Sequence, residues 1–456
     1  MPVELTEGAL RDAVAVLGEH DLDAAHAAEA ALEWMGWERY GPLRLRRYDV
    51  QVLVWYTLPR KLLPSLEFKR EAVGALARTF DYLGGRAATY AEVCRSPETD
   101  QLLCAWEYED PDAWRRFREL LEGSGIEPPD TDLLAWGHVM GLEEACVRNQ
   151  VATALEEAIE AGRLAVGATG FRRRQAQVAN AALREPSDES AALTRLQAVH
   201  AERLERWLEH GRPPGGPERR AIIAPVAPAV CLDPAAIDPA LASAALAPAL
   251  WLLDRGQDGI ALTQTGALNR ALVREAVERW PGWWHSERFG PPHREHDVAM
   301  LRELHGLLRR LRLVRLAGRR IITTARGRKL RDDPAALLAA LAGELLVGES
   351  FAAACAELAS ALILDGAIVD YSGAIARQIY PAILAEGWRS AGHRPSQLDV
   401  TWAVFDVLRC AESIGLLDRA PDTTVLSPGN LVLTAAGRIG LTSGLRARAL
   451  APAKGR

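Results

Sequence analysis

The feature of this 456-residue chain that could do chemistry is a run of arginines. Between Arg302 and Arg331, eleven residues are basic and only Glu303 is acidic, although the whole chain has a net charge of −6. Guanidinium groups neutralise phosphates, and a dense basic patch is the electrostatic footprint of a nucleic-acid surface. A solvated arginine-rich face is the alternative, because the chain has 50 arginines and only 4 lysines. The charge pattern makes this stretch the leading candidate for a binding site.

The same stretch predicts the secondary structure that carries these arginines. Leucines recur at three- and four-residue steps and predict an amphipathic helix with one buried stripe: Leu301, Leu304, Leu308 and Leu311. The opposite face of that helix would carry Arg302, Gly306, Arg309 and Arg310. We therefore expect a helix that turns basic side chains outward.

A short hairpin is predicted to follow this helix. Leu313–Leu316 and Arg319–Thr323 are two strand candidates, joined at Ala317-Gly318. The tip would gather further arginines: Arg315, Arg319 and Arg320. Thr324 is a suitable N-cap for the next helix, and Arg326 and Arg328 lie just beyond it.

The strand–Thr–helix ending recurs in the sequence. Val432–Arg438 (VLTAAGR) matches Ile322–Arg328 (ITTARGR), and Ile260–Gly266 is a weaker third copy, with Thr265 as the expected helix start. A helix and a short strand precede the later copy, so we expect a second module over about Leu398–Leu441. Its helix carries Trp402 and Phe405 but only one arginine, Arg409, which suits packing against protein better than binding DNA.

These segments together resemble the winged-helix region of uncharacterised proteins from high-GC bacteria, where it is often appended to other domains. The resemblance extends from Gly259 to Leu441 when the second copy is included. It implies a helix in the DNA major groove and a wing on the backbone or minor groove, and it carries no catalytic residues. From their charge and position, the predicted nucleic-acid-binding residues are Arg302, Arg309, Arg310, Arg315, Arg319, Arg320, Arg326 and Arg328. The helix of the second module departs from the family pattern, because it lacks a basic face.

The rest of the chain predicts a mainly α-helical fold with short β-hairpins in its C-terminal half. We expect an acidic all-helical domain over residues 1–210, an Ala/Pro-rich linker or connector over 211–258, a first, basic winged-helix-like module over 259–345, and a helical segment with a second such module over 346–456. Residues 1–210 have a net charge of −12 and the remainder +6, which favours separate roles. The run Val50–Val54 suits a strand or a helix; we favour a helix from about Asp49 that ends before Pro59.

No local motif for catalysis or cofactor binding is present in the sequence. The chain lacks GxxxxGK[ST], HExxH and GxSxG, and we expect no catalytic, cofactor or metal residues, although a dispersed active site in residues 1–210 stays open. His293, His296 and His305 are near one another in sequence, but a metal site needs three or four converging ligands. We expect Trp283 and Trp284 to pack against the first module rather than to stack on bases.

The composition leads to one function hypothesis and one alternative. Six scattered cysteines without a CxxC motif, and no apolar run of about 18 residues, predict a cytoplasmic protein that does not span a membrane. The first hypothesis is a protein with a transcription- or DNA-associated role that binds duplex DNA through the basic module. The alternative is a protein-interaction scaffold that packs on a partner or forms a homodimer.

Overall fold

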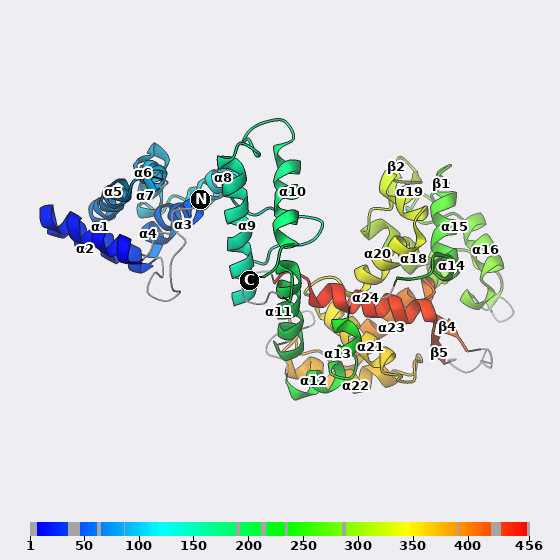
Figure 1. Cartoon of the computed structure of the whole chain (residues 1–456). Coiled ribbons are helices and arrows are strands. Elements are labelled where there is room, and N and C mark those ends of the chain that lie inside the picture. Colours follow the sequence, from blue (N-terminus) through cyan, green and yellow to red (C-terminus); the bar gives the residue numbers. More distant parts are fainter. Residues whose placement is uncertain are drawn as a thin grey trace. The chain divides into compact units, whose positions relative to one another are not determined.

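The computed structural model describes residues 7–34, 46–61, 65–85, 87–187, 192–210, 216–232, 236–284, 289–389, 392–420 and 430–453. The chain divides into two compact units: unit 1 is Met1–Val199 with Pro452–Arg456, and unit 2 is His200–Ala451. Each unit has its own hydrophobic core. Figure 1 shows that helices dominate both units, and the described strands are short, antiparallel and confined to unit 2. The predicted fold class, mainly α with short hairpins, is confirmed.

Unit 1 is built from helices. In chain order they are α1 (Glu7–His20), α2 (Leu22–Trp34), α3 (Arg47–Val52), the π-helix η1 (Leu53–Thr57), α4 (Leu58–Lys61), α5 (Leu66–Leu83), α6 (Ala87–Arg95), α7 (Pro97–Glu107), α8 (Ala113–Gly123), α9 (Leu142–Glu160) and α10 (Phe171–Leu183). The ambiguous run around Val50 is helical, as predicted, because Leu53, Val54 and Leu58 are buried on one side of it. The helix continues through Pro59, since proline is tolerated in the first turn of α4.

Helix α11 (Arg195–His210) leads into unit 2. The helices and strands that follow are α12 (Pro217–Ile223), α13 (Ala227–Cys231), α14 (Pro239–Ala245), α15 (Ala247–Arg255), β1 (Ile260–Ala261), α16 (Arg270–Arg279), the 3-10 turns η2 (Pro281–Trp283) and η3 (Glu295–Asp297), α18 (Ala299–Arg310), β2 (Val314–Ala317), β3 (Arg320–Thr323), α19 (Ala325–Arg331), α20 (Pro334–Leu346), α21 (Phe351–Leu364), α22 (Ala374–Ala385), α23 (Gln397–Ser413), β4 (Leu417–Arg419), β5 (Leu431–Leu433) and α24 (Ala435–Ala449).

The Ala/Pro-rich segment before the first module contains helices α12 to α15. These helices contribute fully buried side chains, among them Ile223, Val230 and Leu253, to the core of unit 2. Prolines stand in the first turn of each helix, where the missing N–H is not needed. The segment is therefore part of the packed core of this unit.

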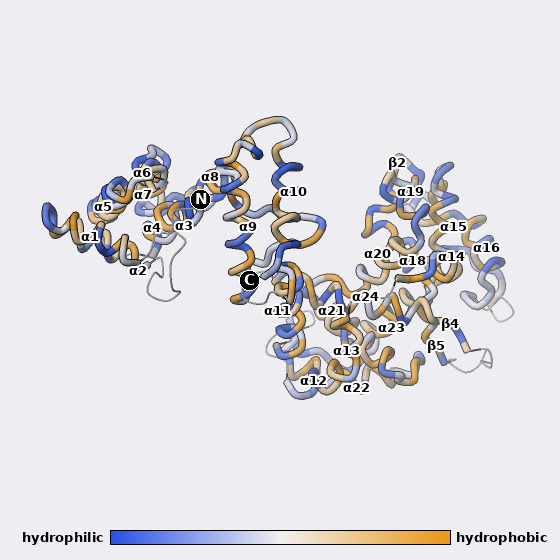
Figure 2. Tube along the Cα trace, viewed as in Figure 1, coloured by the Kyte–Doolittle hydropathy of each residue, from blue (hydrophilic) through white to orange (hydrophobic). Residues whose placement is uncertain are grey.

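Helix α24 lies at the centre of unit 2, packed against α13, α14, α20 and α21 (Figure 1). Glycines permit the close contact: a Cβ at Gly444 would lie 2.9 Å from the carbonyl oxygen of Ala342. Figure 2 shows α20 and α21 as largely hydrophobic, and both supply buried leucines. Among the described helices, no single one is long and apolar enough to cross a membrane, although α20 and α21, bent by 120°, reach that length and composition as a pair.

Unit 2 contains one helix–strand arrangement twice. In residues 247–331, the first module, helix α15 is followed by β1, α16, α18 and the β2–β3 hairpin, and β3 lies between β1 and β2 in an antiparallel sheet. In residues 351–449, the second module, α21 is followed by a bridge at Val369, then α22, α23 and the β4–β5 hairpin. Val369 pairs with Leu431 of β5 as Ile260 pairs with Ile321 of β3. The second arrangement thus starts with α21.

Candidate nucleic-acid interface

A threonine cap holds the hairpin of the first module to the helix that follows it. The hydroxyl of Thr324 accepts a hydrogen bond from the Gly327 amide at 3.0 Å and lies 2.8 Å from the carbonyl oxygen of Arg312, to which it donates. A Cβ at Gly327 would lie 2.2 Å from the carbonyl oxygen of Leu313, so only glycine fits there. The predicted cap at Thr324 is confirmed. It joins the start of α19 to the backbone just before β2 and so fixes the position of the hairpin.

The expected cap at Thr265 is wrong. Helix α16 begins at Arg270, and the side chain of Asn269 accepts the capping hydrogen bond from the Leu272 amide at 3.0 Å. The chain turns at Gly266, which has a φ of 80°, before it reaches the helix. Ile260–Gly266 therefore resembles the other two copies only in its strand, β1, and not in the helix cap.

The β-sheet of the first module has an inner and an outer face. Val314 pairs with Thr323 and is buried with it, whereas Arg315 pairs with Ile322 on the other face. Arg320 lies on that outer face as well, since it pairs with Ala317. Because side chains alternate across a strand, the pairing register places both arginines on the side of the sheet that faces solvent.

All eight predicted nucleic-acid-binding arginines are exposed, but their ion pairing differs. Arg302 is held by the Glu303 carboxylate at 2.6 Å and Arg310 by that of Glu344 at 3.3 Å. The guanidinium of Arg328 donates to the backbone carbonyl of Thr323 at 3.0 Å. Among the described residues, no carboxylate forms an ion pair with the other five, which are Arg309, Arg315, Arg319, Arg320 and Arg326. The hairpin and its flanks thus carry the uncompensated positive charge.

The two acidic partners differ in how visible they are in the sequence. Glu303 follows Arg302 directly in the sequence, so the local charge pattern already indicates this ion pair. Glu344 lies 34 residues from Arg310, on α20, and no local pattern signals the contact. The packing of α20 brings this carboxylate to the end of α18.

Helix α18 is buried on two sides. Leu301, Leu304 and Leu308 face the core of the first module and are fully buried. Helix α23 of the second module packs along another side, where Leu307 is also fully buried. At this contact the Cys410 thiol lies 3.8 Å from the Glu303 carboxylate, and burial raises the pKa of that thiol to about 12. The sequence predicted the first buried side but not the second.

The histidines near α18 do not converge. His305 is buried, and its Nδ1 lies 2.6 Å from the carboxylate of Glu295, whose other oxygen accepts from the Leu268 amide at 2.7 Å. His293 and His296 are exposed. In the part of the chain that the structure describes, no three His, Cys, Asp or Glu side chains form a group suited to a metal ion. The His305–Glu295 contact instead ties η3 to α18.

The tryptophans before α18 pack against the first module, as predicted. Trp280 stacks on Trp283 with ring centroids 5.0 Å apart and meets Trp251 edge-to-face at 5.2 Å. Trp284 donates from its indole N–H to the carbonyl oxygen of Gly290 at 2.7 Å. Trp283 and Trp284 are half-buried. These rings line the edge of the module and are engaged by its own side chains.

The second module repeats the cap but not the charge. The hydroxyl of Thr434 accepts from the Gly437 amide at 2.8 Å, and a Cβ at Gly437 would lie 1.9 Å from the carbonyl oxygen of Leu416. The outer side of α23 carries Trp402, which is 54% exposed, and Leu398, which is 62% exposed. Phe405 contacts the Trp402 ring edge-to-face at 5.9 Å. This face is aromatic and apolar where α18 has arginines.

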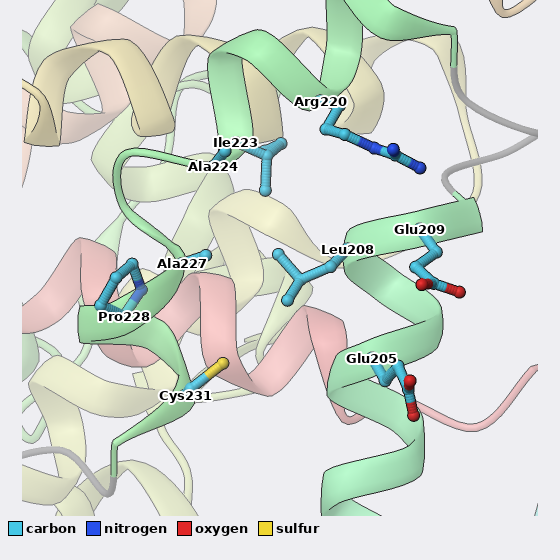
Figure 3. A pocket seen from close by; sticks show the side chains of 9 residues that line it. All are labelled: Glu205, Leu208, Glu209, Arg220, Ile223, Ala224, Ala227, Pro228 and Cys231. Atoms are coloured by element: carbon cyan, nitrogen blue, oxygen red, sulfur yellow. The ribbon is translucent and has the colours of Figure 1, made fainter.

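A surface groove of about 520 Å³ lies elsewhere in unit 2, between α11, α12 and α13. Figure 3 shows Leu208 and Ile223 directed into it, with Cys231 at one end and Arg220 and Glu209 at the rim. Its walls are mostly apolar, and the Cys231 thiol is exposed. Its charged and thiol-bearing lining residues are Glu205, Glu209, Arg220 and Cys231.

Comparison with known protein families gives a match to part of the chain. The family model Y4jL N-terminal domain matches residues 243–336, which is well under half of the chain. These bounds enclose the first module from α15 to α19 and leave out the second module. Searches of curated proteins and of solved structures return no match. The C-terminal half of the chain thus contains a segment similar to the Y4jL N-terminal domain.

Proposed function

We propose that residues 243–336 form a winged-helix module that binds duplex DNA, and that the protein has a DNA-associated role. The order helix, strand, helix, helix, hairpin, with β3 between β1 and β2, supports the winged-helix assignment. In this proposal α18 is the third helix and β2–β3 is the wing. The second module would be a winged helix as well, with α23 and β4–β5 in the same places.

The observation that carries DNA binding is the set of five exposed arginines without ion-pair partners among the described residues. An arginine that already pairs with a carboxylate loses that contact when it binds phosphate, whereas an unpaired one does not. Arg315, Arg319 and Arg320 lie together on and beside one hairpin. Each neutralised phosphate releases counterions and strengthens binding at low salt.

The test is a fluorescence anisotropy titration of the full chain against a 20-base-pair duplex at several salt concentrations. We expect the logarithm of the affinity to fall with the logarithm of the salt concentration with a slope of about −4. The variant R315A/R319A/R320A should lower the magnitude of that slope by about 3 and weaken binding at low salt at least tenfold.

The matched control is R163A/R173A/R184A, which removes three exposed arginines of unit 1 and changes the net charge equally. It should leave the affinity within about twofold of the wild type. No binding at low salt, or equal losses in the two triple variants, would refute the proposal.

A protein-interaction scaffold is the second candidate function. The aromatic face of α23 favours it, because a tryptophan that is 54% exposed beside an exposed leucine is typical of a protein contact. Light scattering across a salt series tests this candidate. A monomer at every protein and salt concentration, together with no partner recovered through this face, would exclude it.

A further inference from the structure

We infer that the first module binds duplex DNA along its phosphate backbone without reading base sequence, because the rest of unit 2 keeps α18 out of the major groove. This inference rests on the proposed function and specifies its ligand: duplex DNA of any sequence. The helices packed around α18 support it, independently of the number of arginines.

Helix α18 has three faces about a third of a turn apart, at about 100° per residue. The first, with Leu301 and Leu308, faces its own module. The second is the face of Glu303 and Leu307, and α23 packs along it. Only the third face is open to solvent.

The open face of α18 is narrow. It carries Arg302, Gly306 and Arg309, and Arg302 is already paired with Glu303. A base-reading helix must enter a groove about 12 Å wide and about 8.5 Å deep, and a helix with its side chains nearly fills that width. Two packed helices have axes about 8–10 Å apart and form a ridge of about 20 Å. With α23 packed against it, α18 offers only this narrow face, and the pair as a whole is broader than the groove.

Helix α23 cannot move aside cheaply. Val400, Val404 and Leu408 are fully buried, and they belong to the hydrophobic core that also contains the leucines of α18. Helix α20, which follows α19, also packs against α24, which follows the second hairpin. The two modules therefore share one core, and freeing α18 would require that core to open.

The hairpin is the part of the first module that remains free to meet DNA. Its turn contains Gly318, with a φ of 60°, and Leu316 near the tip is 58% exposed. Arg315, Arg319 and Arg320 have no carboxylate partner among the described residues. Phosphate contacts position a protein on DNA but carry no direct sequence information. Binding through this hairpin would therefore depend on salt and hardly on sequence.

The experiment uses the full chain and two kinds of probe. Anisotropy titrations compare three unrelated 20-base-pair duplexes of equal base composition, and a selection from a randomised duplex pool looks for a preferred sequence. We expect affinities within about threefold of one another and no enriched motif. An enriched sequence that binds more than tenfold tighter would overturn the inference and leave DNA binding itself intact.

A variant of α18 tests the same point independently. A Cβ at Gly306 would meet only the end of the flexible Arg310 side chain, at 3.5 Å, and Gly306→Leu adds bulk to the open face. We expect its affinity to stay within about twofold of that of Gly306→Ala, the control without the bulk. A loss of more than tenfold would mean that α18 approaches the bases, which overturns the inference. Absence of binding to every duplex would overturn the proposed function and this inference together.

Discussion

The two modules of unit 2 share a framework and differ in what they present to solvent. Thr324 and Gly327 close the first framework, and Thr434 and Gly437 close the second with the same hydrogen bonds. The hairpins lie well apart in Figure 1. The open face of α18 has Arg302 and Arg309, and that of α23 has Trp402 and Phe405. The framework is fixed by close backbone contacts, whereas the outer faces are free to take different chemistry.

The modules also differ in buried charge. The second module and α12 share a buried ionic cluster: the Arg219 guanidinium contacts the carboxylates of Glu357 at 2.8 Å and Glu386 at 3.2 Å, and Arg448 lies 2.9 Å from Glu357. In the first module, the corresponding buried polar contact is the pair of His305 and Glu295. A buried cluster of this kind is sensitive to any change that leaves one charge without its partner.

The largest expected effect comes from the glycines of the shared cap. Gly327→Ala and Gly437→Ala each place a Cβ within 2.2 Å of a backbone carbonyl oxygen, so each should lower the free energy of unfolding by about 3 kcal/mol. Urea unfolding measures this. Gly343→Ala on α20 is the control, since its Cβ meets nothing within 4 Å, and it should be neutral or stabilising by about 0.5–1 kcal/mol. Equal losses of unfolding free energy would show that both modules depend on the same cap. A loss in only one of the two variants would contradict this.

An intermediate effect is expected from the ionic cluster. Burial raises the pKa of Glu386 to about 7 from an ordinary value of 4.5. The folded state then binds its proton more tightly, so this group stabilises the fold at low pH, and the stabilisation is lost as pH rises from about 5 to 7. Glu386→Gln should remove a pH-dependent difference of roughly 2 kcal/mol. Urea unfolding between pH 5 and 8 tests this, with the exposed Glu205→Gln as control; identical pH profiles for Glu386→Gln and wild type would contradict it.

The smallest effect is expected at Trp402. Because its side chain is 54% exposed, Trp402→Ala should change the free energy of unfolding by less than about 1 kcal/mol. DNA affinity should stay within about twofold of the wild type, because the aromatic face is not part of the proposed DNA surface. Unfolding and anisotropy measurements decide both points. A large loss of DNA affinity would show that the faces of the two modules act together.

Local patterns predicted the elements of the first module well. The leucine stripe of α18, the cap at Thr324 and the short hairpin follow from side-chain periodicity and capping chemistry, which act within a few residues. In the second module, the repeated motif and the helix before it cover only about Leu398–Leu441. Its first two helices, α21 and α22, have no charge pattern or repeated motif, and they join the second module through packing against α23 and through the bridge from Val369 to Leu431.

The sequence by itself determined the helical fold, the basic hairpin and the exposure of its arginines, because these depend on neighbours along the chain. Tertiary packing decided which arginines remain unpaired, since Glu344 reaches Arg310 from another helix. It also decided that α18 lies against α23, where the Cys410 thiol meets the Glu303 carboxylate, a contact that local periodicity does not indicate. Contacts between residues far apart in sequence have no local signature, and they fix which surface of the first module stays exposed.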